Sequence, residues 1–198
     1  MQDFNVTIID FNDSFSLNIS STLLEMNIKS CLLHYSSIQD HDFNFEKANF
    51  IILGPGPGHP TDYSPYVQKS LDSFFHQKNV FVLGICLGHQ LILSYMGAQC
   101  KKRKYPVHGQ CKEINIPNWP AIFEKSKLGK RIFVQEYNSL FMSSSSIKET
   151  SSIKLYSKED EIIMSSGSNF LTYQFHPESI GTGDPFTFFK FIKRSNYV

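Results

Sequence analysis

The chain has 198 residues, of which 41% are hydrophobic and 14% aromatic, with 19 basic against 18 acidic side chains. This composition excludes a disordered chain, and the near-zero net charge provides no positive field to hold nucleic acid or an acidic membrane surface. Because domains commonly have about 100–200 residues, we expect one domain over residues 1–198.

The N-terminus and the apolar runs indicate where the protein resides. Residues Met1–Phe4 lack the basic stretch and apolar run of a secretory signal. The longest apolar runs, such as Val80–Leu83, are strand-sized, whereas a membrane helix needs about 20 apolar residues. We therefore expect a cytoplasmic protein with no membrane segment, in which the four cysteines stay reduced.

The first half of the chain alternates apolar runs with segments of helical periodicity. Strands are predicted at Val6–Asp10, Ile28–His34, Phe50–Leu53 and Val80–Ile85. Helices are predicted at Phe15–Met26, at Ser64–Gln77 behind an Asp62 cap, and at Leu87–Met96. This alternation favours a mostly parallel central sheet with helices on both faces.

The second half has shorter segments. Residues 101–116 and 152–175 alternate in a way that suits antiparallel or mixed strands. Helical character returns at 185–193, and the serine run Ser143–Ser146 is typical of an exposed loop. The expected fold class is therefore α/β, with a smaller antiparallel or mixed sheet beside the central one.

A candidate nucleophile stands in the stretch Gly84-Ile85-Cys86-Leu87-Gly88, between a predicted strand and a predicted helix. A nucleophile on such a sharp turn needs small neighbours, which the two glycines supply. The helix N-terminus stabilises a negatively charged sulfur, and the Leu87 amide would face the oxygen of an attacked carbonyl. The alternative for Cys86 is a buried structural cysteine. Cys31, Cys100 and Cys111 lack any such setting, and we interpret all three as structural.

A zinc site is a weaker interpretation of the remaining cysteines. Cys100, His108 and Cys111 could share a zinc ion, but no fourth ligand stands at a metal-like spacing. The sequence therefore predicts no metal and no cofactor.

A candidate base and its orienting carboxylate stand in Phe175-His176-Pro177-Glu178, at the end of a strand predicted at Phe170–Phe175 and interrupted by Gln174. Residues i and i+2 of an extended segment point the same way, so His176 and Glu178 can face each other. A thiol nucleophile needs an imidazole that takes its proton and later protonates the leaving amine, and a carboxylate that orients the imidazole. The alternative is a surface turn.

A glycine loop, Gly54-Pro55-Gly56-Pro57-Gly58, follows the predicted strand Phe50–Leu53. Ligands of open parallel sheets collect at such strand ends, and the loop can present bare amides, including a second oxyanion donor. No Gly-Lys-Ser/Thr follows the loop, so a phosphate-binding role is disfavoured. A purely structural turn is the remaining alternative.

Together these elements resemble the class I (triad-type) glutamine amidotransferases, above all the glutaminase subunits of anthranilate synthase and aminodeoxychorismate synthase. The resemblance spans nearly the whole chain, through the motifs DFNDSF (10–15), GPGPG (54–58), LGICLGHQ (83–90), HG (108–109), YNSL (137–140) and QFHPES (174–179). It implies a flavodoxin-like fold, with Cys86 as nucleophile, His176 as base and Glu178 as orienter. It further implies an oxyanion hole from Gly58 and Leu87, and glutamine contacts from Gly56, Pro57, Gly58, Leu87, Gln90, Ser139 and Leu140.

Three positions depart from the family's pattern. Asn138 stands where histidine is usual, Glu136 where arginine is frequent, and Phe11 where asparagine is common. If Ser139 and Leu140 bind glutamine through their backbone, as the family implies, the change at Asn138 need not affect the chemistry. In the early motif, we interpret the acidic residues at 10 and 13 as structural or partner-facing.

The resemblance implies a glutaminase that hydrolyses L-glutamine and delivers ammonia to a larger, chorismate-binding synthase subunit in a heterodimer or heterotetramer. We expect component II of anthranilate synthase, in tryptophan biosynthesis, with the aminodeoxychorismate synthase subunit of folate biosynthesis as the alternative. A length of 198 residues suits a free-standing subunit rather than the fused or extended relatives. Alternatives from other classes are a stand-alone γ-glutamyl cysteine hydrolase and a non-catalytic binding subunit.

Overall fold

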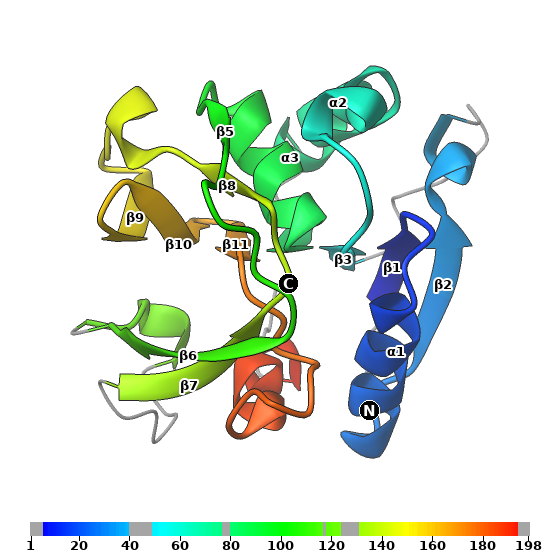
Figure 1. The fold of residues 1–198 in the computed structure, drawn as a ribbon. Helices are drawn as coiled ribbons and strands as arrows, with labels where there is room; N and C mark the ends of the chain where they lie inside the picture. The colour runs from blue at the N-terminus through cyan, green and yellow to red at the C-terminus, as the bar shows by residue number, and fades with distance from the viewer. Residues whose placement is uncertain (1–5, 40–48, 77–79, 117, 124–130, 194–198) are drawn as a thin grey trace.

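The computed structural model describes residues 6–39, 49–76, 80–116, 118–123 and 131–193 (Figure 1). Its centre is a seven-stranded sheet in the order β2-β1-β3-β4-β11-β10-β9. These strands are β1 (Val6–Asp10), β2 (Ser30–His34), β3 (Phe50–Leu53), β4 (Phe81–Ile85), β9 (Ile153–Lys158), β10 (Glu161–Gly167) and β11 (Phe170–Tyr173). All four strands predicted in the first half are present, with small differences at their first residues.

The sheet is mostly parallel, as predicted. β1 pairs in parallel with β2 and β3, β3 with β4, and β4 with β11. The antiparallel character of the second half appears where β10 pairs with β11 and β9. It also appears in two small sheets, which pair β5 (Cys100–Lys102) with β8 (Leu140–Met142) and β6 (Gln110–Asn115) with β7 (Arg131–Glu136).

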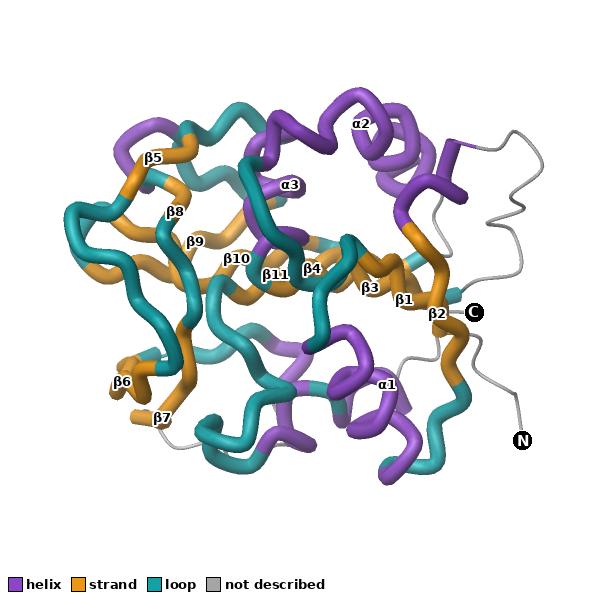
Figure 2. Tube along the Cα trace, turned by 45° about the vertical axis from the view of Figure 1, so that its right-hand side comes forward, coloured by secondary structure: helices purple, strands orange, loops and turns teal. Residues whose placement is uncertain are grey.

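Helices cover both faces of the central sheet, as Figure 2 shows: α1 (Phe15–Glu25) on one, and α2 (Pro60–His76) and α3 (Leu87–Tyr95) on the other. Side chains of β3 alternate between the two cores. Ile52 belongs to the core that includes Leu23 of α1, whereas Ile51 belongs to the core that includes Leu91 of α3. A strand covered on both faces needs apolar residues at every position, which explains the unbroken apolar run of β3.

The register of the central strands brings three chain segments to one edge of the sheet. Leu53 at the end of β3 pairs with Gly84 of β4, and Ile85 at the end of β4 pairs with Tyr173 of β11. The glycine loop, the cysteine turn and the segment with His176 therefore all begin at the same edge. This arrangement positions the candidate site.

The predicted start of the second helix is wrong. α2 begins at Pro60 and not at Ser64, because the loop ends in a proline that is well suited to the first helical position. Asp62 consequently lies inside the first turn, where its carboxylate accepts a hydrogen bond of 2.8 Å from the His59 amide. Gln77, the predicted last residue of this helix, lies outside the described residues.

The serine run is not an exposed loop as a whole. Ser143 is fully buried and donates a hydrogen bond of 2.8 Å to the Asp160 carboxylate, which also accepts the Ser145 amide at 3.0 Å. Ser144–Ser146 forms a short 3₁₀ turn. The serine run therefore forms hydrogen bonds to the Asp160 carboxylate of the same chain.

The helical character predicted at 185–193 is present as two short 3₁₀ helices, Pro185–Phe188 and Lys190–Lys193. Phe188 of the first 3₁₀ helix and Phe191 of the second are both buried. Within the described ranges, no helix combines the length and apolar character that crossing a membrane requires.

Candidate active site

Cys86 lies on a strained turn between β4 and α3. Its backbone has φ 53° and ψ −99°, a conformation that non-glycine residues rarely adopt. The turn is held from both sides, because the Cys86 amide donates to the Tyr173 carbonyl at 2.8 Å and the Gly88 amide donates to the Gly54 carbonyl at 3.2 Å. Backbone strain that neighbouring strands maintain in this way is typical of a functional position.

The two glycines beside Cys86 are required by close packing. A Cβ added to Gly88 would lie 2.1 Å from the Leu53 carbonyl oxygen, and one added to Gly84 would lie 2.7 Å from the Gly88 backbone. Backbone atoms cannot move away as a flexible side chain can. The need for small neighbours that the sequence indicated therefore has a direct cause in the close contact of α3 with β3 and β4.

His176 and Glu178 are brought together by a buried hydrogen bond. Nδ1 of His176 lies 2.7 Å from Oε1 of Glu178, and their side chains are 2% and 0% exposed. The predicted route to this contact is wrong, because β11 ends at Tyr173 and the segment turns after His176 instead of staying extended. His176 is fixed as an isolated bridge partner of Gln135, whose carbonyl accepts the His176 amide at 2.9 Å.

The protonation of His176 depends on opposing effects. Burial lowers the pKa of His176, but the neighbouring Cys86 sulfur and the Glu178 carboxylate outweigh burial and hold this pKa well above its usual value. Because Nδ1 faces Glu178, the ring has Nε2 left for a second partner, and this atom makes no hydrogen bond within the described part of the chain. The geometry suits an imidazole that exchanges a proton with the sulfur.

Two aromatic rings enclose the imidazole. The ring centres of Phe15 and Tyr137 lie 4.8 and 5.0 Å from that of His176. The Tyr137 hydroxyl lies 3.2 Å from the Ser179 hydroxyl, so Tyr137 also contacts the chain segment that contains His176 and Glu178. No role was predicted from the sequence for Phe15 or Tyr137, although both belong to the motifs that it contains.

Gln174 is a functional candidate to which no role was assigned from the sequence. Its Nε2 lies 3.8 Å from the Cys86 sulfur, and its Oε1 accepts a hydrogen bond of 3.2 Å from Gln90. Gln90 also donates to the Leu140 carbonyl at 3.2 Å. The sequence feature that could have indicated a role is that Gln174 interrupts an apolar run. A polar residue buried with such a run needs a hydrogen-bond partner.

The glycine loop packs against the residue after the nucleophile. A Cβ on Gly56 would lie 2.5 Å from the Leu87 side chain, Gly58 has φ +81°, and the Pro57 carbonyl accepts the Tyr63 hydroxyl at 3.0 Å. The glycine loop is therefore fixed close to the helix that follows Cys86. Outside this loop, the Ser139 carbonyl accepts the Arg103 amide at 2.8 Å.

The remaining polar candidates have structural surroundings. The Asp10 carboxylate accepts a hydrogen bond of 2.7 Å from Ser16, and that of Asp13 accepts the Phe15 amide at 2.9 Å, so both stabilise the start of α1. Burial raises the pKa of Cys100 to about 11. In the described part of the chain, no three His, Cys, Asp or Glu side chains group closely enough to hold a metal ion.

The family model for class-I glutamine amidotransferases matches residues 7–194. The chain is 29% identical over 192 residues to a Schizosaccharomyces pombe protein named as an aminodeoxychorismate synthase, covering 93% of this chain but only 25% of that protein. It is 29% identical over 199 residues to anthranilate synthase component 2 of Lactococcus lactis, covering 96% and 95% of the two chains. It is 30% identical to the Saccharolobus solfataricus component 2, covering 88% and 90%.

A comparison of folds gives a consistent result. The crystal structure of a Thermoplasma acidophilum protein, described as part of a GMP synthase, superposes with a TM-score of 0.80 over 98% of this chain and 94% of that one, at 20% identity. A glutamine amidotransferase of Thermotoga maritima superposes with a TM-score of 0.72 over 90% of this chain and 77% of that one, at 16% identity. At such identities the similarity establishes the fold alone.

Proposed function

The chain belongs to the class-I glutamine amidotransferases, and from this premise we propose that it hydrolyses L-glutamine with Cys86, His176 and Glu178 and delivers ammonia to a chorismate-using synthase subunit. The observation that carries the proposal is the strained Cys86 turn beside a buried His176–Glu178 pair with a 2.7 Å contact. A thiol, a base and an orienting carboxylate are the set that amide hydrolysis by a cysteine requires.

The proposed reaction has two stages. His176 takes the proton of the Cys86 thiol, and the sulfur attacks the side-chain amide carbon of glutamine to form a tetrahedral intermediate. His176 then gives a proton to the amide nitrogen, the carbon–nitrogen bond breaks, and ammonia leaves a glutamyl thioester. Water, activated by His176, hydrolyses the thioester to glutamate and restores the thiol. Glu178 holds the imidazole in one orientation through both stages.

The oxyanion of both intermediates needs hydrogen-bond donors next to the sulfur. The amides of Leu87 and Gly58 fill this role in our proposal. The contact of the glycine loop with Leu87 supports it, because that contact brings the two backbone segments together. The proposed contacts to the rest of glutamine come from Gly56, Pro57, Gln90, Ser139 and Leu140.

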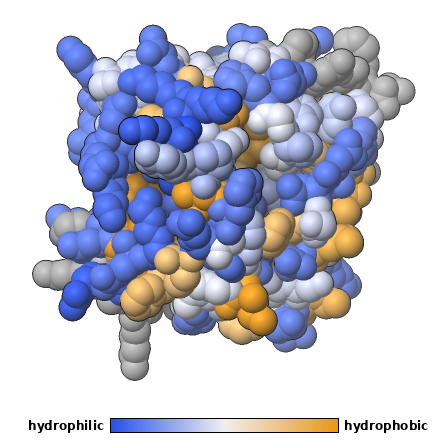
Figure 3. Space-filling view, in the orientation of Figure 1, coloured by the Kyte–Doolittle hydropathy of each residue, from blue (hydrophilic) through white to orange (hydrophobic). Residues whose placement is uncertain are grey.

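A synthase subunit is proposed as the consumer of ammonia. The Lactococcus and Saccharolobus relatives, matched over nearly their full length, are named anthranilate synthase component 2. Exposed apolar side chains on segments next to the site, Tyr105, Phe133 and Ile180, are suited to contact with a second protein. Figure 3 shows apolar areas among hydrophilic ones on the face it presents. We therefore propose anthranilate synthase first and aminodeoxychorismate synthase second.

Reconstitution tests the proposed function. The chain is combined with the large subunit of anthranilate synthase or of aminodeoxychorismate synthase, and product formation from chorismate and glutamine is followed. We expect anthranilate to form with the first of these partners. Formation of aminodeoxychorismate with the second partner only would support the alternative. No glutamine-dependent product with either one would overturn the proposal.

A further inference from the structure

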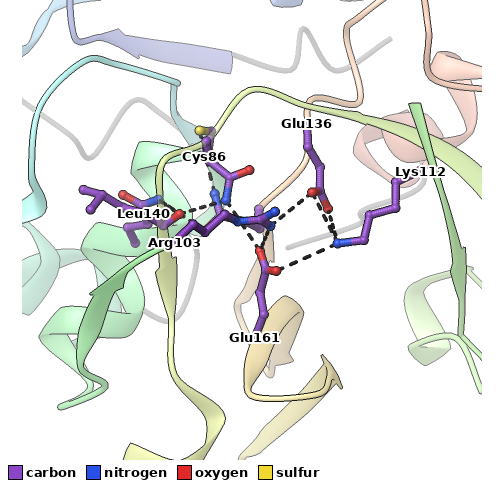
Figure 4. Close-up of polar contacts among 9 residues, drawn as sticks. Cys86, Arg103, Lys112, Glu136, Leu140 and Glu161 are labelled. Carbon is purple, nitrogen blue, oxygen red and sulfur yellow. Dashed lines mark hydrogen bonds and ion pairs between the residues drawn. The ribbon is translucent and has the colours of Figure 1, made fainter. Parts of the chain in front are cut away.

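Four charged side chains that the proposed mechanism does not use form a cluster beside the site (Figure 4). In this ionic cluster, the Arg103 guanidinium contacts Glu136 at 3.1 Å and also contacts Glu161. The Lys112 ammonium lies 3.4 Å from both Glu136 oxygens and 3.9 Å from Glu161. Two cations therefore face two carboxylates.

The ionic cluster is largely shielded from water. The Glu136 side chain is 0% exposed and those of Arg103 and Glu161 are 13% and 14% exposed, whereas that of Lys112 is 29% exposed. Charges in such surroundings interact strongly and hold one geometry, because solvent screens them poorly. The cluster can therefore act as a fixed anchor for the chain segments that meet it.

Asn138 connects the ionic cluster to Leu140, one of the proposed glutamine contacts. Its Nδ2 lies 3.5 Å from Glu161 Oε1 and donates a hydrogen bond of 2.8 Å to the Leu140 carbonyl. The same carbonyl accepts Gln90, which donates to Gln174, whose amide nitrogen lies 3.8 Å from the Cys86 sulfur. A continuous set of polar contacts thus joins the cluster to the nucleophile.

Further contacts limit how this segment can move. The Arg103 amide donates to the Ser139 carbonyl at 2.8 Å, and the Val107 amide donates to the Asn138 carbonyl at 3.1 Å. Asn138 is 3% exposed, and its Oδ1 makes no hydrogen bond to the described residues. Burial of an unsatisfied acceptor is costly, so stability alone is a poor explanation for an asparagine at this position.

We propose that Asn138, anchored on the ionic cluster of Arg103, Lys112, Glu136 and Glu161, is a positioning residue. It holds the Leu140 carbonyl and the Gln90 amide where glutamine must lie for attack by Cys86. This inference rests on the proposed function, because it assigns the cluster a part in binding the proposed substrate. The side chain of Asn138 acts through Leu140 and Gln90 and does not itself enter the reaction.

Two alkylating reagents separate positioning from a merely structural role. Azaserine is a glutamine analogue that must occupy the substrate site before it alkylates the cysteine, whereas iodoacetamide needs only an accessible, reactive sulfur. The variants are Asn138→Leu, which keeps the side-chain size but removes the donor, and Asn138→Ala, which is smaller. Lys101→Met is the control, since Lys101 lies on the neighbouring strand β5 and pairs with Asp160, and neither residue makes any of these contacts.

We expect both Asn138 variants to raise the half-saturating azaserine concentration by roughly fivefold to tenfold, the effect of one neutral hydrogen bond. The limiting azaserine rate, the iodoacetamide rate and the melting temperature should stay close to those of the parent chain, and Lys101→Met should change none of them. An unchanged half-saturating concentration, or an equal loss of both alkylation rates, would overturn the positioning role. If the parent chain reacts with iodoacetamide but not with azaserine, the proposed function itself fails.

Discussion

Nδ1 of His176 lies 2.7 Å from Oε1 of Glu178, and both side chains are closed to solvent. The pair is two residues apart in the chain, but a turn stabilised from β7 creates the contact. The contact matters for the chemistry, because the buried Glu178 carboxylate fixes which ring nitrogen of His176 faces the sulfur. The same carboxylate favours the charged imidazole that must form when the thiol is deprotonated.

Replacing Glu178 by glutamine tests this relationship. The Glu178→Gln variant keeps the size of the side chain but removes the negative charge that helps to raise the His176 pKa. We expect the pKa of His176 to fall and glutamine hydrolysis to slow by about a hundredfold to ten-thousandfold, the usual contribution of acid–base catalysis. NMR titration of the imidazole and steady-state assays measure the two effects. An unchanged rate would remove Glu178 from the mechanism.

Close packing at Gly88 predicts a local effect on stability. In Gly88→Ala the new Cβ would lie 2.1 Å from the Leu53 carbonyl oxygen, so we expect a loss of about 1–3 kcal/mol or more in the free energy of unfolding. Gly183→Ala is the control, because its nearest contact would be an ordinary 3.8 Å to the Phe133 oxygen. Denaturant unfolding compares the two variants, and equal stability of both would contradict the packing argument.

His89 predicts a pH dependence of stability. Burial lowers its pKa to about 3, although a backbone contact with Ile162 opposes the shift. As the pH falls below about 6.5, the unfolded chain binds a proton at this histidine and the folded chain does not. The free energy of unfolding should therefore fall by about 1.4 kcal/mol for each pH unit from this source.

A substitution isolates the contribution of His89. Nδ1 of this residue lies 2.8 Å from the Thr172 hydroxyl, and glutamine can keep a polar contact there without titrating. Urea unfolding between about pH 6.5 and 5, above the range of ordinary carboxyl groups, should show a smaller slope in His89→Gln than in the parent chain. Equal slopes would mean that His89 is already charged in the folded protein.

Sequence patterns predicted the strands more reliably than the ends of the helices. The apolar run of β3 is a direct result of burial on both faces, so its four residues were predicted without error. The start of α2 depended on Pro60 and on a carboxylate reaching back to His59, which apolar periodicity does not report. The C-terminal turns depended on the packing of Phe188 and Phe191 against distant strands.

The candidate site likewise has parts that the sequence predicts and parts that it does not. The strained turn at Cys86 could be predicted because two glycines flank a residue between a strand and a helix. The contact of Gln174 with the sulfur and the ionic cluster around Glu136 join residues that lie far apart in the chain. No local pattern contains such contacts, so they required the folded chain.

The most direct test of the proposed function replaces Cys86 by alanine in the complex with its synthase partner. We expect synthesis from chorismate and glutamine to stop, while synthesis from chorismate and added ammonium salt continues at the rate of the parent complex. An unchanged melting temperature would show that the variant is folded. Glutamine-dependent synthesis that persists in Cys86→Ala, or loss of the ammonium-dependent reaction as well, would contradict the role of Cys86 as the glutaminase nucleophile.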